Sequence, residues 1–342
     1  MNVGLKIVNG RSLDDTLEHR DYRVFYDLDG EDNLDEDTFE EEFEIPTVNA
    51  DEKSKRVLAL ENAEETIKHQ NEKYLNEESE WYSKLNDFSD LPEEEFKEEK
   101  AGLNNEYLYA RGLLTPEDLP VDKDSERFFE EINLSRVYIP SSYSAVEENL
   151  VSDVKDQLQC GSCVAFSTMA AIETCFKKQT GVFGDYSEQQ LIDCGYGENG
   201  AAGCEGAGLS SYLKLIKNTD LELTHENTYP YLNRNPKLTC PTVEPYFQGA
   251  KVLGLMYCNV TENVKWQVIN SYYTFNGNEE VLKKLVATFG AVMSTVASSG
   301  PFQYYGGGIF SGCTSSKQDH AITVVGYGED NGEDFWLIKN SW

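Results

Sequence analysis

The chain has 342 residues, of which 39% are hydrophobic and 12% aromatic, enough apolar material for one large or two ordinary packed domains. Its formal net charge of -32 would repel phosphate groups, which argues against nucleic acid and anionic membranes as partners. No stretch approaches the ~18 apolar residues that a membrane span needs. The N-terminal stretch also lacks the apolar core of a secretory signal.

The negative charge is concentrated in the first part of the chain. Residues 1–138 hold 39 acidic and 16 basic side chains, whereas residues 139–342 hold 22 and 13. We expect residues 1–46 to form an acidic, poorly ordered leader, because their apolar residues are weakly patterned. This leader is interpreted either as a solvated tail or as an electrostatic switch that weakens at low pH.

A helical region follows the leader. Apolar residues recur at helical spacing through Glu52–Asn76 on a charged background, which predicts a helix there. Pro116 and Pro120 would interrupt a helix, so residues 106–138 are interpreted as a linker. Gly, Tyr and Cys become more frequent from Ile139 onward, and we place a domain boundary there.

The remainder of the chain begins with helices and continues with strands. A helix is predicted over Cys163–Gln179, because Gly161-Ser162 precedes it and Gly181 follows it. Further helices are predicted over Ser187–Asp193, Gly208–Lys217 and residues 279–289. Strands are predicted over Ala291–Val296, Ala321–Tyr327 and Phe335–Lys339. Helices first and antiparallel strands later indicate an α+β fold.

All eight cysteines lie between residues 160 and 313. Confinement to one block indicates a disulfide framework in one folded module, and therefore an oxidising compartment. The CxxC formed by Cys160 and Cys163 could instead be a redox motif or half of a zinc site. No second CxxC and no His pair at finger spacing accompany it, so we expect no metal.

The strongest local signal is DQLQCGSCVAFS, residues 156–167, which places a thiol at the start of a helix. The unpaired N–H groups and the dipole of a helix N-terminus favour a thiolate, the reactive nucleophile. Cys163 is therefore the candidate nucleophile. The side-chain amide of Gln157 and the backbone N–H of Cys163 are candidate donors to a developing oxyanion.

A thiolate nucleophile needs a base, and only two histidines follow residue 138. His320 lies at the start of a predicted strand, where its side chain can face a cleft, whereas His225 lies in a loop-like context and is expected at the surface. Asn340 ends the neighbouring predicted strand, so its carbonyl could orient the imidazole. Trp342 could cover that hydrogen bond.

The CGSC and AFS motifs, the His strand ending in GYG and the NSW tripeptide resemble the papain and cathepsin L family of cysteine proteases. The resemblance implies a papain-like two-lobed fold, with a helical lobe and an antiparallel β-barrel-like lobe. It also implies that Cys163, His320, Asn340 and Gln157 are catalytic. Substrate binding is implied for Gly206, Ala207, Leu209, Asp319 and Ala321, and disulfides for Cys160–Cys204 and Cys194–Cys240. The family uses no cofactor.

The resemblance extends upstream of the domain boundary. Members carry an inhibitory prodomain with a spaced E-R-F-N-I-N pattern and a second pattern, G-x-N-x-F-x-D. The first is met here by Glu52, Arg56, Ile67 and Asn71, with Leu60 and Ala63 as replacements, and the second by Asn86, Phe88 and Asp90, with Lys84 for Gly. Residues 47–138 are thus expected to be an inhibitory prodomain, with a helical core at 47–105, that runs backwards through the cleft and blocks it.

Several positions depart from the family pattern. Val164 replaces the usual tryptophan, and Ala207 replaces the second glycine of GCxGG. Leu158 replaces a glycine, and the leucine would be strained if the position needs positive φ. The chain stops after NSW where members continue, so we expect the catalytic domain, residues 139–342, to be C-terminally truncated and Cys313 to lack its partner. Cys175 and Cys258 are expected to pair.

Three functions remain in competition. The favoured one is a cysteine-type endopeptidase, made as a zymogen, that hydrolyses peptide bonds through a thioester acyl-enzyme. Its partners would be peptide or protein substrates and its own prodomain, and it would be a monomer in the lysosome or outside the cell. The alternatives are an inactive homologue that binds or inhibits other proteins, and a thiol-disulfide oxidoreductase, which would need Cys160 free.

Overall fold

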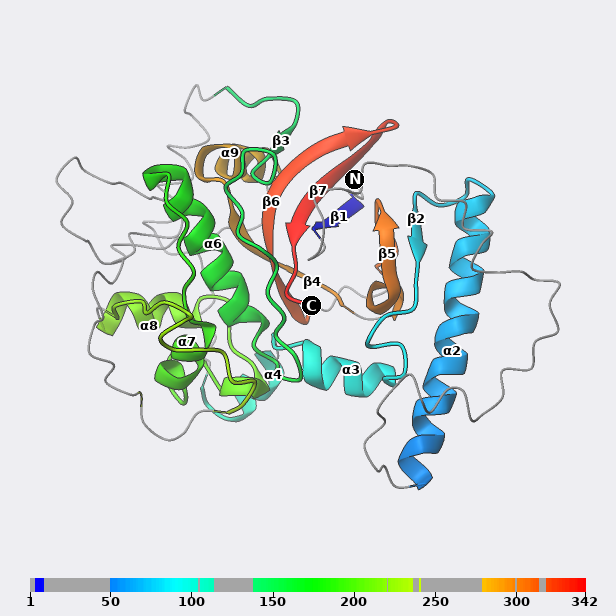
Figure 1. The fold of residues 1–342 in the computed structure, drawn as a ribbon, viewed down its shortest axis with the longest axis horizontal. Coiled ribbons are helices and arrows are strands. Elements are labelled where there is room, and N and C mark those ends of the chain that lie inside the picture. The colour runs from blue at the N-terminus through cyan, green and yellow to red at the C-terminus, as the bar shows by residue number, and fades with distance from the viewer. Residues whose placement is uncertain are drawn as a thin grey trace.

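The computed structural model describes residues 4–8, 50–103, 105–113, 138–219, 221–235, 240, 279–298, 300–313 and 318–342. In these residues a helical lobe faces a β-lobe, and an N-terminal helical region lies along the outer side of the β-lobe (Figure 1). The predicted α+β class is confirmed.

The helical lobe is built around α6, Cys163–Thr180, which ends at Gly181 with φ of 72°. A left-handed glycine is a common helix stop because it has no Cβ to clash. The helix α7, Glu188–Gly195, begins where the Ser187 hydroxyl accepts a hydrogen bond from the backbone N–H of Gln190. The lobe also contains the short 3-10 helix η3, Gly203–Glu205, and α8, Ser211–Thr219.

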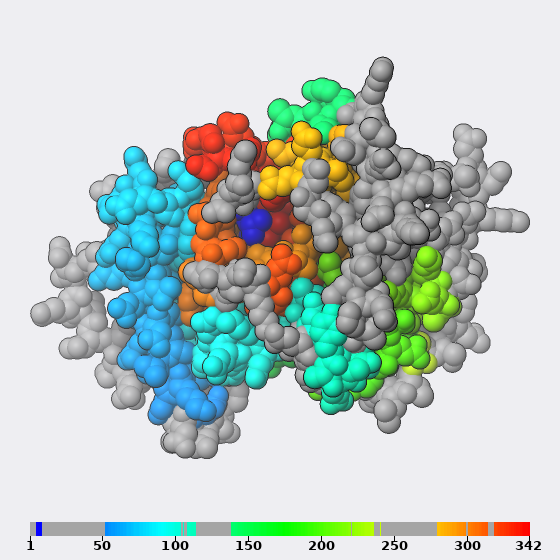
Figure 2. Space-filling view, turned by 180° about the vertical axis from the view of Figure 1, so that it is seen from behind, coloured from blue at the N-terminus to red at the C-terminus, as the bar shows by residue number. Residues whose placement is uncertain are grey.

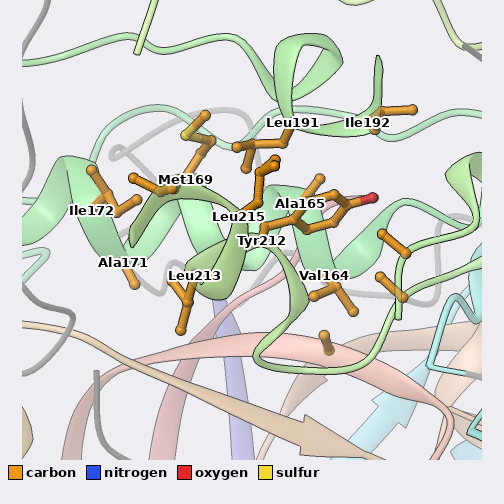
Figure 3. Close-up of a cluster of buried hydrophobic side chains, with 14 of the residues drawn as sticks. Val164, Ala165, Met169, Ala171, Ile172, Leu191, Ile192, Tyr212, Leu213 and Leu215 are labelled. Atoms are coloured by element: carbon orange, nitrogen blue, oxygen red, sulfur yellow. The ribbon is translucent and has the colours of Figure 1, made fainter. Parts of the chain in front are cut away.

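The core of the helical lobe lies between these helices (Figure 3). Met169 and Ile172 of α6 pack with Leu191 of α7 and with Tyr212 and Leu215 of α8. These are all nearly inaccessible to water, so α6 is surrounded by protein along most of its length. The same cluster contains Val164, the residue in place of the expected tryptophan. Val164 is fully buried, so the first turn of α6 is packed despite the smaller side chain.

The β-lobe is a five-stranded sheet with the order β1-β7-β6-β3, in which β4 also pairs with β6. Its strands are β1 (Gly4–Val8), β3 (Tyr143–Ser144), β4 (Val292–Val296), β6 (His320–Asp330) and β7 (Glu333–Lys339). The three strands predicted from sequence correspond to β4, β6 and β7, which pair antiparallel. The lobe also holds α9 (Glu279–Phe289), the 3-10 helix η4 (Gly300–Tyr304) and β5 (Tyr305–Gly308).

The first strand corrects the prediction of weak order for residues 1–46. Gly4–Val8 form β1, which pairs with β7 in parallel, from Gly4 opposite Phe335 to Val8 opposite Lys339. The strand's partner is over 300 residues away in sequence, a distance at which local patterning carries no signal. The rest of the predicted leader lies outside the described residues.

The N-terminal region begins with α2, Ala50–Leu75, which confirms the predicted helix. Asn71 of this helix exchanges two hydrogen bonds with the backbone of Ser83, at 2.9 and 3.1 Å, and so fixes β2, Trp81–Ser83. β2 pairs antiparallel with β5 of the β-lobe. The chain continues through α3, Glu93–Lys100, and α4, Asn105–Ala110, which cross from the β-lobe toward the helical lobe (Figure 1).

Within the described residues, none of the helices is long and apolar enough to cross a membrane. In the same residues, no group of three or more His, Cys, Asp or Glu side chains could hold a metal ion.

Candidate active site

Cys163 is the first residue of α6, as the sequence predicts, and its side chain is fully buried. Its Sγ accepts hydrogen bonds from two backbone N–H groups. One comes from Ala321 of β6 at 3.4 Å, and the other from Gly102 of the N-terminal region at 3.3 Å. The candidate nucleophile is therefore enclosed between both lobes and the N-terminal region.

The protonation state of this thiol differs from the sequence-based expectation of a thiolate. Burial raises the pKa of Cys163 to about 11, although the N–H groups of Ala321 and Gly102 act in the opposite direction. Loss of hydration disfavours a charged sulfur more than the helix N-terminus and these donors favour it. In the structure as it stands, the candidate nucleophile is a neutral thiol at neutral pH.

His320 begins β6 and is also fully buried. Its Nε2 lies 2.7 Å from Oδ1 of Asn340, which follows β7, so the asparagine orients the ring. The indole of Trp342 covers this pair, with its ring centroid 4.4 Å from that of the imidazole. Burial lowers the pKa of His320 to about 4, against the hydrogen bond with Asn340 that raises it. By contrast, His225 is exposed, as expected for a surface residue.

Gln157 is fully buried beside these residues. Its Oε1 accepts a hydrogen bond of 2.6 Å from the Ser341 hydroxyl, which fixes the direction of the amide. The Nε2 group donates to the carbonyl of Cys160 at 2.9 Å and to the carbonyl of Lys100 at 3.1 Å. The Nε2 group that we predict to stabilise an oxyanion thus donates to a backbone oxygen of the N-terminal region.

The stretch Lys100–Leu103, called the blocking segment below, crosses the site. The Lys100 carbonyl oxygen lies 3.2 Å from Nδ1 of His320, in addition to its bond from Gln157. The Gly102 carbonyl accepts from the N–H of Ala207 at 2.9 Å, and the Leu103 N–H donates to the carbonyl of Asp319 at 2.9 Å. Backbone groups of this segment therefore contact each wall of the site.

Gly102 allows this close approach. A Cβ at this position would lie 1.8 Å from the carbonyl oxygen of Gly161 and 3.1 Å from Sγ of Cys163. On the opposite side, a Cβ on Gly206 would lie 2.2 Å from the Gly102 carbonyl oxygen, and Gly206 has φ of 111°. Facing glycines therefore bring two backbones together over the candidate nucleophile.

The residues predicted to bind substrate gather around the blocking segment. Ala207 and Asp319 hydrogen bond to it, Gly206 faces it, and Ala321 shares an apolar cluster with Leu103. Leu209 packs against the same cluster from outside. Gly206, Ala207 and Asp319 thus lie directly against the blocking segment, whereas Leu209 and Ala321 belong to or border the apolar cluster that contains Leu103.

The side chain of Lys100 is buried as well, with 4% of it exposed. Its Nζ donates to the Leu158 carbonyl at 2.6 Å, lies 3.9 Å from Asp156, and sits 4.5 Å from the ring centre of Phe88. Leu158 has φ of 50°, so this position does need a positive φ, and the leucine there is strained.

A buried ionic network lies behind the site. Lys155 contacts carboxylates of Glu173 at 3.2 Å and Glu188 at 2.9 Å. Glu173 also accepts from the Ser152 hydroxyl, to which Lys339, the neighbour of Asn340, donates at 2.9 Å. The network links the end of β7 to the helical lobe, and burial lowers the pKa of Lys339.

Sequence reasoning predicted that the prodomain blocks the cleft but did not identify the residues that do so, and it missed this network. The available signal for the segment was a Gly-Leu pair directly after a charged helix. The clash that makes Gly102 indispensable depends on Gly161, a residue far away in the sequence. The signal for the network was Lys155, which stands two residues before Gln157.

The disulfides bear on the competing functions. Cys160 is bonded to Cys204 and Cys194 to Cys240, the two pairs implied by the resemblance. Because Cys160 is not free, the oxidoreductase interpretation is wrong. Cys175 is also disulfide-bonded, whereas Cys258 lies outside the described residues. Of the described cysteines, Cys163 and Cys313 are free.

Comparison with known proteins gives consistent matches. The model of the papain family of cysteine proteases matches residues 139–342. Cysteine protease XCP2 of Arabidopsis thaliana is 34% identical over 84% of this chain and 71% of its own length. Digestive procathepsin L 3 of Tenebrio molitor has a TM-score of 0.66 at 28% identity, covering 90% of this chain and 87% of its own. The proform of the ragweed pollen allergen Amb a 11 has a TM-score of 0.70 at 27% identity, with coverages of 90% and 75%.

Proposed function

The chain belongs to the papain family and is a cysteine endopeptidase in zymogen form, and we propose that Cys163 is its nucleophile, His320 its general base and acid, Asn340 the residue that orients His320, and Gln157 an oxyanion donor. The observation that supports these roles is the blocking segment. Its backbone contacts Cys163, His320 and Gln157 at once, as a bound peptide would.

The reaction proceeds through an acyl-enzyme. His320 takes the proton of the Cys163 thiol as Sγ attacks the carbonyl carbon of a peptide bond. The oxyanion receives the hydrogen bond that Gln157 now gives to Lys100. His320 protonates the leaving amine, and a thioester forms between the substrate and Cys163. His320 then takes a proton from water, which hydrolyses the thioester and returns the thiol. Asn340 holds the imidazole through both transfers.

Activation requires the blocking segment to leave. Exposure to water removes the desolvation that raises the pKa of Cys163 and lowers that of His320, so a thiolate–imidazolium pair becomes accessible. The substrates are peptides or proteins, and an apolar side chain fits the place of Leu103. The disulfides are consistent with the secretory route, and we assign the enzyme to the lysosome or the extracellular space.

Active-site labelling tests these roles. Acid-treated protein is incubated with an epoxysuccinyl peptide, and the modified residue is identified by peptide mass mapping. We expect labelling at Cys163 that is lost in His320→Ala and retained in His225→Ala, the exposed control. Folded protein that is not labelled, or labelling that survives His320→Ala, would support the inactive homologue instead.

A further inference from the structure

β1 lies between two segments of the β-lobe. On one side it pairs with β7 over five residues, from Gly4 to Val8. On the other side, Leu5 exchanges two backbone hydrogen bonds with Phe310, at 2.7 and 2.9 Å. The blue atoms of β1 lie in a hollow flanked by orange parts of the catalytic region (Figure 2). β1 is therefore the edge strand of the sheet, and an isolated bridge to Phe310 covers part of its outer side.

The side chains of β1 alternate between two half-buried faces. Leu5 and Ile7 pack against the main apolar cluster of the β-lobe, which includes Phe310, Trp336 and Ile338. Val8 packs against a second cluster with Leu337. Lys6 pairs with Asp330 at 2.6 Å and lies 4.4 Å from the ring centre of Phe335. These contacts are all with the catalytic region, not with the blocking segment.

β1 also pairs with β7, the strand that leads to the candidate active site. Val8 is opposite Lys339, and Lys339 directly precedes Asn340, whose Oδ1 lies 2.7 Å from Nε2 of His320. Removal of β1 would leave the backbone N–H and C=O groups along one side of β7 without partners. The end of β7 would then be free to move, and Asn340 with it.

We propose that Gly4–Val8 stay bound to the catalytic region after the zymogen is cut, so that the mature enzyme consists of two chains, with β1 as a short non-covalent strand that positions Asn340. This inference rests on the proposed function, since it concerns the processed enzyme. Two cuts give this state, one on the C-terminal side of Val8 and one before Ile139, and together they free the blocking segment. Each cut adds one water across a peptide bond and leaves a carboxylate and an ammonium group. Neither cut breaks a contact of β1 with the catalytic region.

Native chromatography of the self-processed enzyme tests retention directly. The active peak is collected, denatured and analysed by mass spectrometry. We expect a peptide that contains Gly4–Val8 in a one-to-one ratio with the catalytic chain. An active peak without this peptide would overturn the inference but leave the proposed function intact. Failure of Cys163 to react at all would instead count against the proposed function.

Variants test the positioning role. Ile7→Asp places a charge against the apolar cluster. Lys6→Gln is the control, because it removes the ion pair with Asp330 and the cation contact with the Phe335 ring but places no charge in the cluster. We expect Ile7→Asp to lower kcat of the processed enzyme roughly 10-fold or more with KM little changed, and a synthetic peptide of residues 1–10 to restore it. If kcat and the peptide's retention match those of Lys6→Gln, β1 has no positioning role.

A second rescue experiment uses wild-type protein, so its result does not depend on whether Ile7→Asp folds. Wild-type zymogen is processed and passed through a denaturant concentration that releases β1 while the disulfides stay intact. Recovery of kcat on addition of the peptide of residues 1–10, but not of the same peptide with Ile7→Asp, is the expected result. Equal recovery with or without the peptide would overturn the inference.

Discussion

Two stretches that precede the matched family region contact it in opposite ways. The blocking segment, Lys100–Leu103, lies over Cys163. Its backbone hydrogen bonds to the walls of the site, and the Lys100 ammonium group adds a hydrogen bond to the Leu158 carbonyl. β1 is the edge strand of the sheet, paired with β7 and bridged to Phe310, with apolar side chains against two clusters. The first occupies the place of a substrate, and the second occupies the place of a structural strand.

This difference indicates which contacts are reversible. The partners of the blocking segment are groups that water or substrate can satisfy once the segment leaves, and two of them, Cys163 and His320, titrate. Apolar burial and strand pairing do not respond to protonation. Conditions that release the segment should therefore leave β1 in place.

Gly102→Val should abolish blocking. The added Cβ meets the backbone of Gly161, which cannot move aside as a side chain could. We expect the blocking segment to lose about 3 kcal/mol or more of its binding, so that Cys163 in the intact zymogen is labelled over ~100-fold faster at pH 7. The control is Ala110→Val, which adds similar atoms at an exposed position of α4. Equal labelling rates for the two variants would contradict the structure.

Acid should weaken the blocked state through His320. Its pKa is about 4 in the buried state against 6.5 normally, so at pH 5 the unfolded chain takes a proton that the blocked state does not. This contribution to stability is intact above pH 6.5 and is lost as the pH falls toward 4. At about 1.4 kcal/mol per pKa unit, the loss approaches ~3 kcal/mol.

The measurement uses Cys163→Ala zymogen, which cannot process itself. Its melting temperature is compared at pH 7 and pH 4.5 with that of the double variant that also carries His320→Gln. We expect the double variant to lose less stability on acidification. If the melting temperatures of the two proteins fall equally on acidification, the acid response comes from other groups, such as the carboxylates of the N-terminal region.

Lys100→Met should weaken blocking moderately. The substitution keeps the length of the side chain but removes the hydrogen bond from Nζ to the Leu158 carbonyl. A charge-assisted bond contributes about 1.5–3 kcal/mol, part of which offsets the burial that lowers the pKa of Lys100. We expect roughly 10-fold faster labelling of the zymogen at pH 7. Lys97→Met, which removes only a surface pair with Glu93, should match wild type.

The sequence was informative where periodicity is strong or motifs are short. The helix predicted over residues 279–289 is the helix observed, and the strand predicted from Ala321 begins one residue earlier, at His320. β1 was not predictable, because five residues beside an acidic stretch give little local signal and their partner lies at the other end of the chain.

In the candidate site too, features with a local sequence signal were predictable and features that depend on distant contacts were not. Cys163, His320, Asn340 and Gln157 were predicted because each stands in a recognisable local motif. In the structure Asn340 lies against His320, and the blocking segment contacts Cys163, His320 and Gln157. The protonation states were not predictable, because they depend on burial by the blocking segment. The sequence of that segment carries no distinctive motif. Its role follows from the close approach of Gly102 to Gly161, which only the structure reveals.

Leu158→Gly should have the smallest effect and should separate stability from blocking. Leu158 holds φ of 50°, a conformation that costs a branched L-residue about 1–2 kcal/mol and glycine little. Because the exposed side chain is not needed for the carbonyl that Lys100 contacts, the glycine relieves strain while the blocking contact remains. We expect a slightly higher melting temperature in both zymogen and mature enzyme, by equal amounts, with labelling of the zymogen at pH 7 unchanged. A gain confined to the mature enzyme would mean that the strain at Leu158 is part of how the blocking segment is held.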